Sequence, residues 1–239
     1  MGLCAPFTKR IANMPNAPDT EAVYDAASLE QLAGVGVPLA VLGHPVGHSL
    51  SPCMHNAALQ WLAEHEDPRY ADWHYYKIDV PPRDLPEQLP RMRALGFHGV
   101  NLTVPHKVEL LRYGLAETVQ PQARKIGAAN TLKRESEGYH AFNTDGFGLS
   151  RAVAEAFYGG QSQPFCGRTV VLLGAGGAAR AAAHQCLDEG CRQLWIGNRD
   201  AQRLQQLVDQ LGDERVQPFS LAQAPESFES GGVLINATS

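Results

Sequence analysis

From Pro38 onward the chain alternates short apolar runs with longer amphipathic stretches. Short apolar runs bounded by Gly and Pro predict buried strands, whereas apolar positions three or four residues apart predict helices. In the first half the expected strands are 38–43, 73–80, 99–104, 128–134 and 138–144, and the expected helices are 51–65 and 83–96. The last two of these strands are close enough along the chain to pair as neighbours.

A second series of the same kind begins at Thr169. Before it, residues 146–158 predict a helix with Asp145 as its N-cap, and residues 158–168 are rich in Gly, Pro and Ser and predict a linker. The strands expected after the linker are 169–174, 193–198, 215–219 and 233–239, and the helices are 177–189 and 200–211. Alternating strands and helices in both halves predict an α/β fold whose largely parallel sheets are covered on both faces.

Residues 1–36 lack this alternation. A short helix is expected within residues 19–36, with Gly34 and Gly36 as its stop signals. We therefore expect an N-terminal extension that is part of neither core.

The stretch GAGGAAR, residues 174–180, follows an apolar strand directly and opens an Ala-rich helix. In this context Gly174 would make a tight turn and Gly176 would let the backbone approach a pyrophosphate, which would then face the helix N-terminus. We predict a dinucleotide site formed by five consecutive residues, Gly174, Ala175, Gly176, Gly177 and Ala178.

The next expected strand ends in Asn198 and Arg199, and Arg203 follows one helical turn later. An Arg in this place accommodates the 2′-phosphate of NADP, whereas an acid takes the ribose hydroxyl of NAD. We therefore predict NADP as the cofactor. Asp200 must point away from that phosphate, most simply as a helix N-cap, because a carboxylate about 4 Å away would cost about 4 kcal/mol per unit charge.

The stretch NLTVPHK, residues 101–107, sets Pro105 at an expected helix start and Lys107 just inside it. The helix dipole disfavours a cation there, so a nearby anion is needed, and FNTDG at 142–146 offers Asp145. A lysine is almost wholly protonated at neutral pH and could donate a proton to a ketone oxygen that receives hydride. The pair predicts a site for proton transfer.

Ser49 and Ser51 stand just before Pro52 and an expected helix. Two hydroxyls with a helix N-terminus behind them could hold a carboxylate without a cation. On this stretch alone, ordinary N-capping by one serine is the simpler interpretation.

Composition and charge argue against several classes of protein. Apolar residues make up 44% and charged residues 19%, which is typical of a globular protein with a proper core. The net charge of −5 argues against nucleic acid as a partner. Five cysteines form no C-x-x-C pair, so free thiols in a reducing compartment are expected. The start MGLCAPFTKR lacks the apolar run of a secretory signal and no stretch predicts a membrane span, so we expect a cytoplasmic protein.

Three histidines, His44, His48 and His55, lie close together in the sequence. Their spacing matches no H-E-x-x-H-type site, so no metal is expected.

Seven motifs occur in the order and approximate spacing of shikimate dehydrogenases: HSLSP, NLTVPHK, GAANT, FNTDG, GAGGAAR, NR and INATS. From about Pro38 to its last residue the chain resembles that family. The resemblance implies an N-terminal α/β substrate-binding domain followed by a Rossmann-type NADP-binding domain with a parallel sheet. It also implies NADP-dependent, reversible reduction of 3-dehydroshikimate to shikimate.

The resemblance assigns roles by motif. Ser49 and Ser51 would bind the substrate carboxylate, while Thr103, Asn130 and Asp145 would bind ring hydroxyls. Lys107 would be the catalytic residue, paired with Asp145. Asn236, in INATS, would belong to the cofactor site.

The resemblance also divides the chain into an extension at 1–36, a substrate-binding catalytic domain at 37–148 and an NADP-binding domain at 149–239. It leads to an expectation of more chain after INATS, so we expect a fragment of a longer polypeptide with an incomplete second domain. Gln122 stands where relatives often carry an acid.

Two other functions stay open: a quinate/shikimate dehydrogenase that uses NAD or NADP, and a non-catalytic shikimate-binding protein. A metal-dependent hydrolase built on the histidines would lose activity with chelators, which we do not expect. The expected partner is a small-molecule substrate, and neither nucleic acid nor a membrane is expected to bind. We expect the protein to be a monomer or a homodimer.

Overall fold

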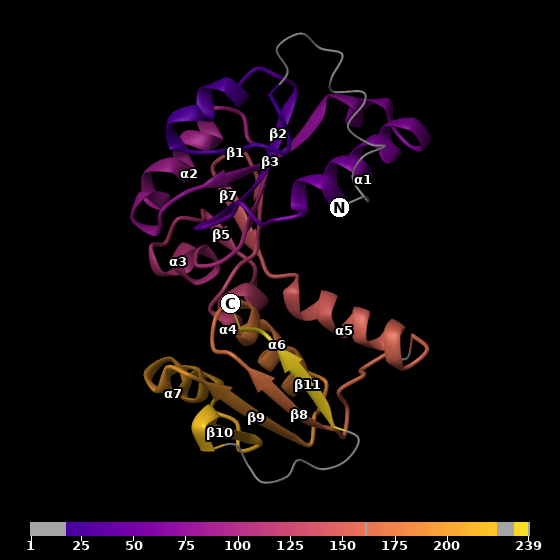
Figure 1. The fold of residues 1–239 in the computed structure, drawn as a ribbon, viewed down its shortest axis with the longest axis vertical. Helices are drawn as coiled ribbons and strands as arrows, with labels where there is room; N and C mark the ends of the chain where they lie inside the picture. The colour runs from indigo at the N-terminus through magenta and orange to yellow at the C-terminus, as the bar shows by residue number, and fades with distance from the viewer. Residues whose placement is uncertain (1–17, 161, 224–231, 239) are drawn as a thin grey trace. The chain divides into compact units, whose positions relative to one another are not determined.

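A computed structural model describes residues 18–160, 162–223 and 232–238, and the chain divides into two compact units (Figure 1). The first unit contains the described residues up to Val119 together with Thr131–Ala141, and the second contains Gln120–Asn130 and the described residues from Phe142 onward. Packing therefore groups 120–130 and 142–148 with the second unit, whereas the sequence places them in the substrate-binding domain. The boundaries of the functional domains remain a prediction.

A seven-stranded sheet forms the centre of the first unit, as far as the chain is described, in the order β1-β3-β2-β4-β6-β7-β5. Its strands are β1 (Val23–Tyr24), β2 (Val37–Gly43), β3 (Trp73–Asp79), β4 (Gly99–Leu102), β5 (Thr118–Val119), β6 (Thr131–Arg134) and β7 (Tyr139–Phe142). The pairs among β1, β3, β2 and β4 are parallel, and β4 pairs with β6 antiparallel. The predicted pairing of the two runs after residue 128 is confirmed, because β6 and β7 are neighbours.

The helices of the first unit are α1 (Ser51–His65), α2 (Leu85–Ala94) and α3 (His106–Arg112), with 3-10 turns at Ala26–Leu32, Pro68–Asp72 and Pro82–Asp84. The bounds of α1 match the sequence prediction, and Pro52 lies in its first turn, where a missing N–H costs nothing. Pro105 is the N-cap of α3 rather than its first residue. Lys107 therefore lies at the second helical position, as near the helix start as predicted.

The described part of the N-terminal segment belongs to the core of the first unit, so its prediction as an extension is wrong there. β1 adds to the sheet in parallel with β3, and Leu29 and Leu32 have no exposed surface. The expected helix is a 3-10 helix preceded by a strand. Arg91 of α2 fixes this helix by donating to the carbonyl of Ala26 at 2.7 Å. Residues 1–17, which include Cys4, lie outside the described residues.

The second unit has a four-stranded parallel sheet, within the described chain, in the order β10-β9-β8-β11. Its strands are β8 (Thr169–Leu173), β9 (Gln193–Asn198), β10 (Val216–Ser220) and β11 (Val233–Asn236), and its helices are α4 (Pro121–Ile126), α5 (Asp145–Phe157), α6 (Gly177–Asp188) and α7 (Ala201–Leu211). In chain order this is 3-2-1-4, the order of the first four strands of the Rossmann fold. The predicted fold class, α/β with parallel sheets, is confirmed.

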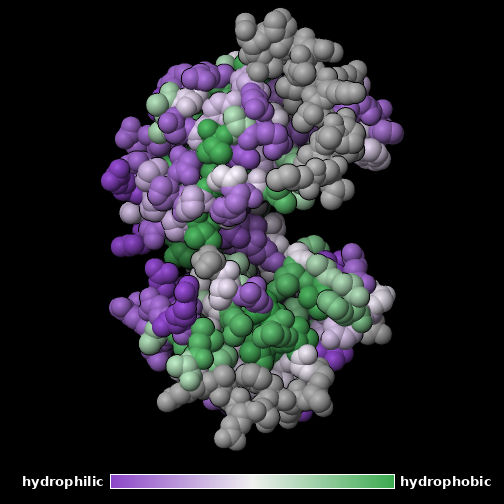
Figure 2. All heavy atoms as spheres, in the orientation of Figure 1, coloured by the Kyte–Doolittle hydropathy of each residue, from purple (hydrophilic) through white to green (hydrophobic). Residues whose placement is uncertain are grey.

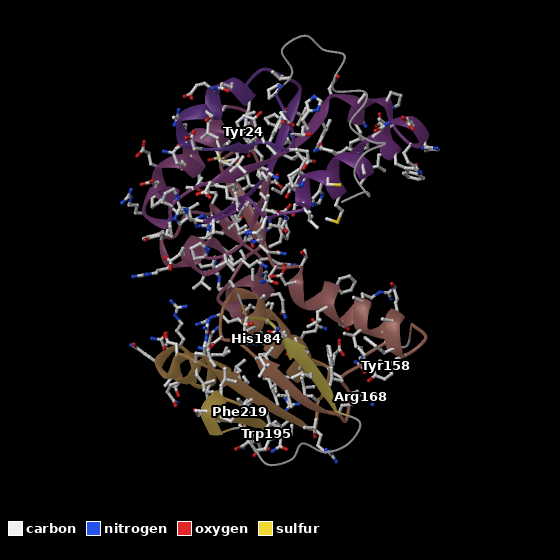
Figure 3. The ribbon with its side chains drawn as sticks, in the orientation of Figure 1. Tyr24, Tyr158, Arg168, His184, Trp195 and Phe219 are labelled. Carbon is white, nitrogen blue, oxygen red and sulfur yellow. The ribbon has the colours of Figure 1, made fainter. Side chains whose placement is uncertain are left out.

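The linker before β8 is held by side chains at both of its ends. Arg168 places its guanidinium 4.3 Å from the ring centroid of Tyr158, the C-cap of α5 (Figure 3). Within the linker, the backbone N–H of Phe165 donates a hydrogen bond to the buried side chain of Glu189, the C-cap of α6, at 3.2 Å. Phe165 is fully buried in a core cluster with residues of β8, β9, α6 and α7, so this residue anchors the linker in the hydrophobic core.

Large hydrophobic side chains are also exposed on the second unit. They include Phe147 and Phe157 on α5 and Leu234 on β11, each at least two-thirds exposed, and hydrophobic residues gather over these elements in Figure 2. Within the described chain, no helix combines the length and apolar character needed to cross a membrane. Cys166, Cys186 and Cys191 are free thiols, as expected.

Replacing Leu29 by Ala tests whether this segment stabilises the fold. The change leaves a cavity in a fully buried site, so we expect the free energy of unfolding to fall by about 2–5 kcal/mol. Gln31→Ala, an exposed position in the same 3-10 helix, is the matched control and should stay within about 0.5 kcal/mol. Urea unfolding measures the free energy of unfolding of both variants. Equal, small effects of the two changes would show that the segment is an appendage.

Candidate functional site

A glycine turn at the end of β8 is shaped by the chain that follows β11. Gly174 has a φ of 119°, and a Cβ built on it would lie 2.6 Å from the carbonyl oxygen of Ala237. The N–H of Ala237 in turn donates to the carbonyl of Leu173 at 2.8 Å. Only glycine combines this backbone conformation with so close an approach, so the tight turn predicted at Gly174 is confirmed.

The turn leads into α6 with its N–H groups uncapped. Gly176 is the N-cap, no side chain caps the helix, and its first turn contains no acid. A Cβ at Gly176 would meet no atom within 4 Å, so the space beside this residue is open. Uncapped N–H groups at the positive end of a helix can hold a phosphate, which makes residues 174–178 a fitting cradle for a pyrophosphate.

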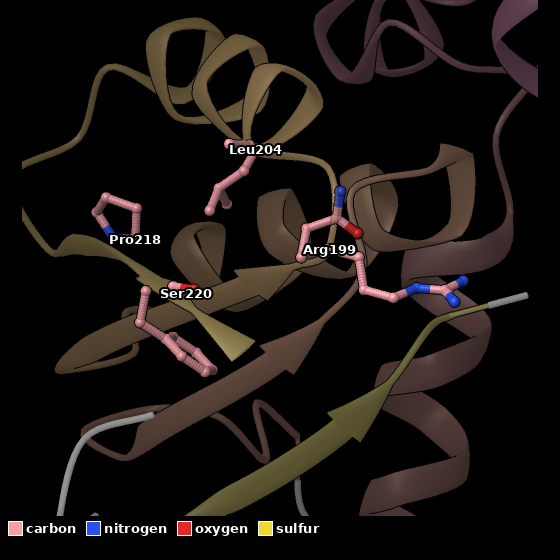
Figure 4. A pocket seen from close by; sticks show the side chains of 7 residues that line it. Arg199, Leu204, Pro218 and Ser220 are labelled. Carbon is pink, nitrogen blue, oxygen red and sulfur yellow. The ribbon is translucent and has the colours of Figure 1, made fainter. Parts of the chain in front are cut away.

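A pocket lies beside the end of the next strand (Figure 4). Its volume is about 180 Å³, and Arg199 lies at its rim, directly after β9. The polar lining residues are Asn198, Arg199 and Ser220, and the apolar ones include Leu204, Pro218 and Phe219. A flat apolar group would find contact here beside a guanidinium, which is the combination that an adenosine with a 2′-phosphate requires.

Asp200 is the N-cap of α7, as predicted, and its carboxylate accepts from the backbone N–H of Arg203 at 3.0 Å. The side chain of Arg203 also pairs with Asp200, with Nε 3.4 Å from Oδ2. Arg203 is therefore partly neutralised, whereas Arg199 is exposed beside the pocket. Of the two arginines predicted for the cofactor, Arg199 has the better position.

The end of β11 forms a short polar turn. Asn236 accepts hydrogen bonds at Oδ1 from the N–H and the hydroxyl of Thr238, at 3.1 and 2.8 Å. This turn sets Ala237 against Gly174, so Asn236 shapes the wall of the glycine turn. A contact of Asn236 with a cofactor remains a prediction.

A second polar cluster of this unit joins the loop before β6 to the start of α5. The side chain of Asn130 donates to Oδ1 of Asp145 at 2.8 Å and to Oγ1 of Thr144 at 2.9 Å, and its own Oδ1 accepts from the N–H of Thr144 at 3.0 Å. Thr144, not Asp145, is the N-cap of α5, so that prediction is wrong. Asp145 is the first helical residue, where the dipole favours a carboxylate. The structure therefore brings together two predicted substrate residues.

Asn143 is a residue of this cluster that the sequence did not single out. It is 8% exposed, its Nδ2 donates to the carbonyl of Ala128 at 2.9 Å, and its Oδ1 accepts from the N–H of Asp145. It fixes the backbone on both sides of the Asn130–Asp145 contact. Its place between Phe142 and Thr144 in the FNTDG motif is the signal that could have identified it.

The predicted carboxylate site lies at the start of α1 in the first unit. Ser51 is the first residue of the helix rather than a loop residue, and Leu50, its N-cap, provides no side-chain bond. Ser49 Oγ accepts from the N–H of Ser51 at 3.3 Å. The first turn contains no acid, so two hydroxyls share a helix start at which no side chain repels a carboxylate.

Thr103 and Lys107 lie at the loop between β4 and α3. The backbone of Thr103 donates to the carbonyl of Leu42 at 2.8 Å and accepts from the N–H of His106, also at 2.8 Å. His106 is fully buried, and its Nε2 contacts the carbonyl of Val80 at 2.8 Å. Burial lowers the pKa of His106, so it is a neutral packing residue that fixes the first turn carrying Lys107. Lys107 belongs to the first unit and Asp145 to the second, and their pairing remains a prediction.

Tyr75 and Asn101 form a polar contact in the first unit that the sequence did not predict. Tyr75 is 2% exposed, and its hydroxyl donates to Oδ1 of Asn101 at 2.7 Å. Asn101 donates from Nδ2 to Oγ1 of Thr131 at 3.1 Å. Burial raises the pKa of Tyr75, so its hydroxyl stays a donor. Asn101 opens the NLTVPHK motif, and a polar residue within a buried strand could have marked it.

The histidines near the serines do not form a metal cluster. His44 Nδ1 lies 2.6 Å from Oδ1 of Asp79, and the ring of His55 stacks on Tyr75. Within residues 18–160, 162–223 and 232–238, no group of three or more His, Cys, Asp and Glu side chains comes together.

The fold and these clusters define a two-unit α/β protein whose second unit has the strand order and glycine turn of dinucleotide-binding proteins. Two family models match the chain: the shikimate dehydrogenase substrate binding domain over residues 41–132, and shikimate / quinate 5-dehydrogenase over residues 160–239. The chain belongs to the shikimate dehydrogenase family.

Comparison with individual relatives supports the same family. The shikimate dehydrogenase (NADP(+)) of Moorella thermoacetica is 42% identical over 173 residues, which cover 72% of this chain and 54% of that protein. The one of Bacillus cereus (strain G9842) is 35% identical, with 83% of this chain and 67% of that protein covered. The solved structure of shikimate 5-dehydrogenase from Thermus thermophilus in complex with NADP(H) and shikimate is 38% identical, has a TM-score of 0.66, and matches over 84% of this chain and 68% of that one. The chain thus spans between 54% and 67% of the length of these curated relatives.

Gly174→Ala tests the close approach at the glycine turn. The added Cβ would overlap the carbonyl of Ala237, and the φ of 119° is strained for Ala, so we expect the protein to be destabilised by about 1 kcal/mol or more. Gly176→Ala is the matched control, because its Cβ would project into open space. Thermal unfolding should show a lower Tm for the first variant only. A normal Tm for Gly174→Ala would mean that the turn is not constrained as described.

Proposed function

We propose that this chain carries the substrate and cofactor residues of an NADP-dependent shikimate dehydrogenase, which reversibly reduces 3-dehydroshikimate to shikimate. The observation that carries the proposal is the pair of sites on neighbouring strands of the second unit: an uncapped glycine cradle after β8 and a pocket with Arg199 after β9. Together they fit a dinucleotide with a 2′-phosphate. The names of the relatives, shikimate dehydrogenase (NADP(+)), support the same cofactor.

The proposed chemistry is hydride and proton addition across one ketone. Bound NADPH supplies the hydride to the carbonyl carbon. Lys107, as an ammonium, donates a proton to the carbonyl oxygen, so that the ketone becomes a secondary alcohol. Asp145 is proposed to hold the ammonium in place, and in the reverse direction the pair shares the proton that the alcohol releases.

The proposed substrate contacts use hydroxyl and amide groups. Ser49 and Ser51, with the start of α1, would hold the carboxylate of shikimate. Thr103, Asn130 and Asp145 would bind its ring hydroxyls, and the fixed orientation of Asn130 and Asp145 supports this role. A site whose buried polar groups hydrogen-bond a substrate hydroxyl discriminates against an analogue that lacks this hydroxyl. Its discrimination is much stronger than that of an apolar pocket.

We also propose a cytoplasmic enzyme that acts on a small molecule without nucleic acid or membrane as partner, as a monomer or homodimer. The net charge of −5 supports the exclusion of nucleic acid.

A spectrophotometric assay of NADPH oxidation with 3-dehydroshikimate tests the proposed activity. In the reverse direction, quinate is compared with shikimate as the substrate, and NAD is compared with NADP as the cofactor. Shikimate binding without NADPH binding would contradict the enzyme and favour a metabolite-binding protein.

Lys107→Met should lower kcat by a factor of about 10²–10⁴, because the proton donor is removed. The KM for NADPH should stay close to that of the unchanged protein, since Lys107 lies outside the proposed cofactor site. Lys133→Met is the matched control, because Lys133 is 63% exposed and pairs with Glu135. Steady-state kinetics measure kcat and KM for the unchanged protein and for both variants. Equal loss of activity in both variants would argue against general-acid catalysis by Lys107.

Arg199→Ala should raise the KM for NADPH about 10- to 100-fold, the loss expected for charge-assisted hydrogen bonds to a phosphate, and leave the KM for NADH nearly unchanged. Arg151→Ala, on the exposed side of α5 where Arg151 pairs with Glu155, is the control. A parallel loss of affinity for both cofactors would place Arg199 outside the 2′-phosphate site.

A further inference from the structure

The six-residue helix α4 is held by side chains of two other helices of the second unit. Gln210 of α7 donates from Nε2 to the carbonyls of Lys125 and Ile126 at 3.1 and 3.0 Å, while its Oε1 accepts from Nη1 of Arg180 on α6. The last carbonyls of a helix have no partner within it, so one amide satisfies two of them. A glutamine fits because it donates and accepts at once.

Asp188 of α6 holds the other side of α4. Its carboxylate lies 2.6 Å from Nζ of Lys125 and accepts from Nε2 of Gln122 at 3.2 Å. Burial acts to raise the pKa of Asp188, but these two hydrogen bonds outweigh it and hold the pKa below its ordinary value. An acid in place of Gln122 would face this carboxylate. We call Gln122, Lys125, Arg180, Asp188 and Gln210 the α4 clasp.

The end of α4 is fitted to the clasp. Gly127, the left-handed C-cap with a φ of 70°, approaches so closely that a Cβ there would lie 2.9 Å from Nε2 of Gln210. Ala128 and Ala129, the next residues, are fully buried. Asn130 follows immediately and donates to Asp145. Four residues, the last two of them buried alanines, therefore separate Lys125 of the clasp from Asn130, and a shift of α4 would move Asn130.

The clasp residues that hold α4, Arg180 and Asp188 of α6 and Gln210 of α7, come from the two helices that begin at the proposed cofactor site. α6 starts at the glycine turn, with Arg180 in its first turns, and α7 starts next to Arg199. α4 packs against α6 in the same unit (Figure 1), and His184, labelled on α6 in Figure 3, is buried one turn before Asp188. The position of Asn130 is thus fixed from the cofactor-binding elements.

We propose that Gln210 and Asp188 are positioning residues, which act through α4 to hold Asn130 against Asp145 in the geometry that substrate binding needs. The role in substrate binding rests on the proposed function, whereas the positioning of α4 does not.

Hydrogen exchange tests the positioning directly. The N–H groups of Gly127 and Ala128 both donate to the carbonyl of Ala123, at 3.0 and 3.3 Å, and report on the end of α4. In the double variant Gln210→Ala/Asp188→Ala we expect their exchange to become about tenfold faster, because several hydrogen bonds are lost. Gln205→Ala/Asp209→Ala removes the same residue types from an exposed pair on α7, joined at 2.7 Å, and should change nothing at these positions.

Gln122→Glu is a milder variant that keeps α7 intact. It places a second carboxylate against Asp188, so we expect faster exchange at Gly127 and Ala128 with an unchanged Tm for the whole chain. Unchanged exchange in both the double variant and Gln122→Glu would overturn the proposal.

Kinetics test the link to the substrate. The double variant should raise the KM for 3-dehydroshikimate about tenfold and leave the KM for NADPH within about twofold, a split that general loosening would not produce. Equal increases in both constants would overturn the positioning role. If the unchanged chain shows no NADPH-dependent turnover, the proposed function fails, while exchange at Gly127 and Ala128 still decides whether the clasp positions α4.

Discussion

The hydrogen bond from Asn130 to Asp145 joins the loop before β6 to the first residue of α5, across the β6–β7 hairpin. The bond, 2.8 Å long, places a carboxylate at the first position of α5, where the helix dipole favours a negative charge. Asn143 fixes the backbone on both sides. The side chain of Asn130 cannot turn away without the loss of its two bonds to Thr144. A charged group held in this way costs no reorganisation when a ligand arrives, which is the physical basis of a preformed polar site.

Local patterns were enough to predict most of the regular elements. α1 begins and ends where its Pro and its apolar spacing predict, and the strands flanking it follow their apolar runs. The pattern failed at Val23–Tyr24 and at α4. A two-residue strand and a six-residue helix are too short to show a period, and each depends on distant partners: β3 for the strand, and Asp188 and Gln210 for the helix.

The site residues divide in the same way. The turn at Gly174 and the N-cap at Asp200 could be predicted from the sequence, because a glycine turn and a helix N-cap are local signals. Tyr75 and Asn101 could not, because their contact joins two strands that are far apart in the chain and only the sheet order brings them together. Asn143 was missed for a different reason: its side chain bonds backbone groups, so only its place in the FNTDG motif could have identified it.

The charges at the helix starts explain where anions can bind. Of the five helices with ten or more residues in the described chain, α2 and α5 carry an acid in the first turn, and α7 is capped by Asp200. Only α1 and α6 of these five have neither an acid in the first turn nor a side-chain hydrogen bond from the N-cap residue. These are the helices behind the two serines and behind the glycine cradle. A carboxylate would be repelled by the acids of α2 and α5 and would compete with Asp200 at α7, so an anion is directed to α1 and α6 by elimination as well as by attraction. The same argument accounts for Asp200 beside Arg199: by using its charge on the N–H groups of α7, the carboxylate leaves the guanidinium as the dominant charge at the pocket.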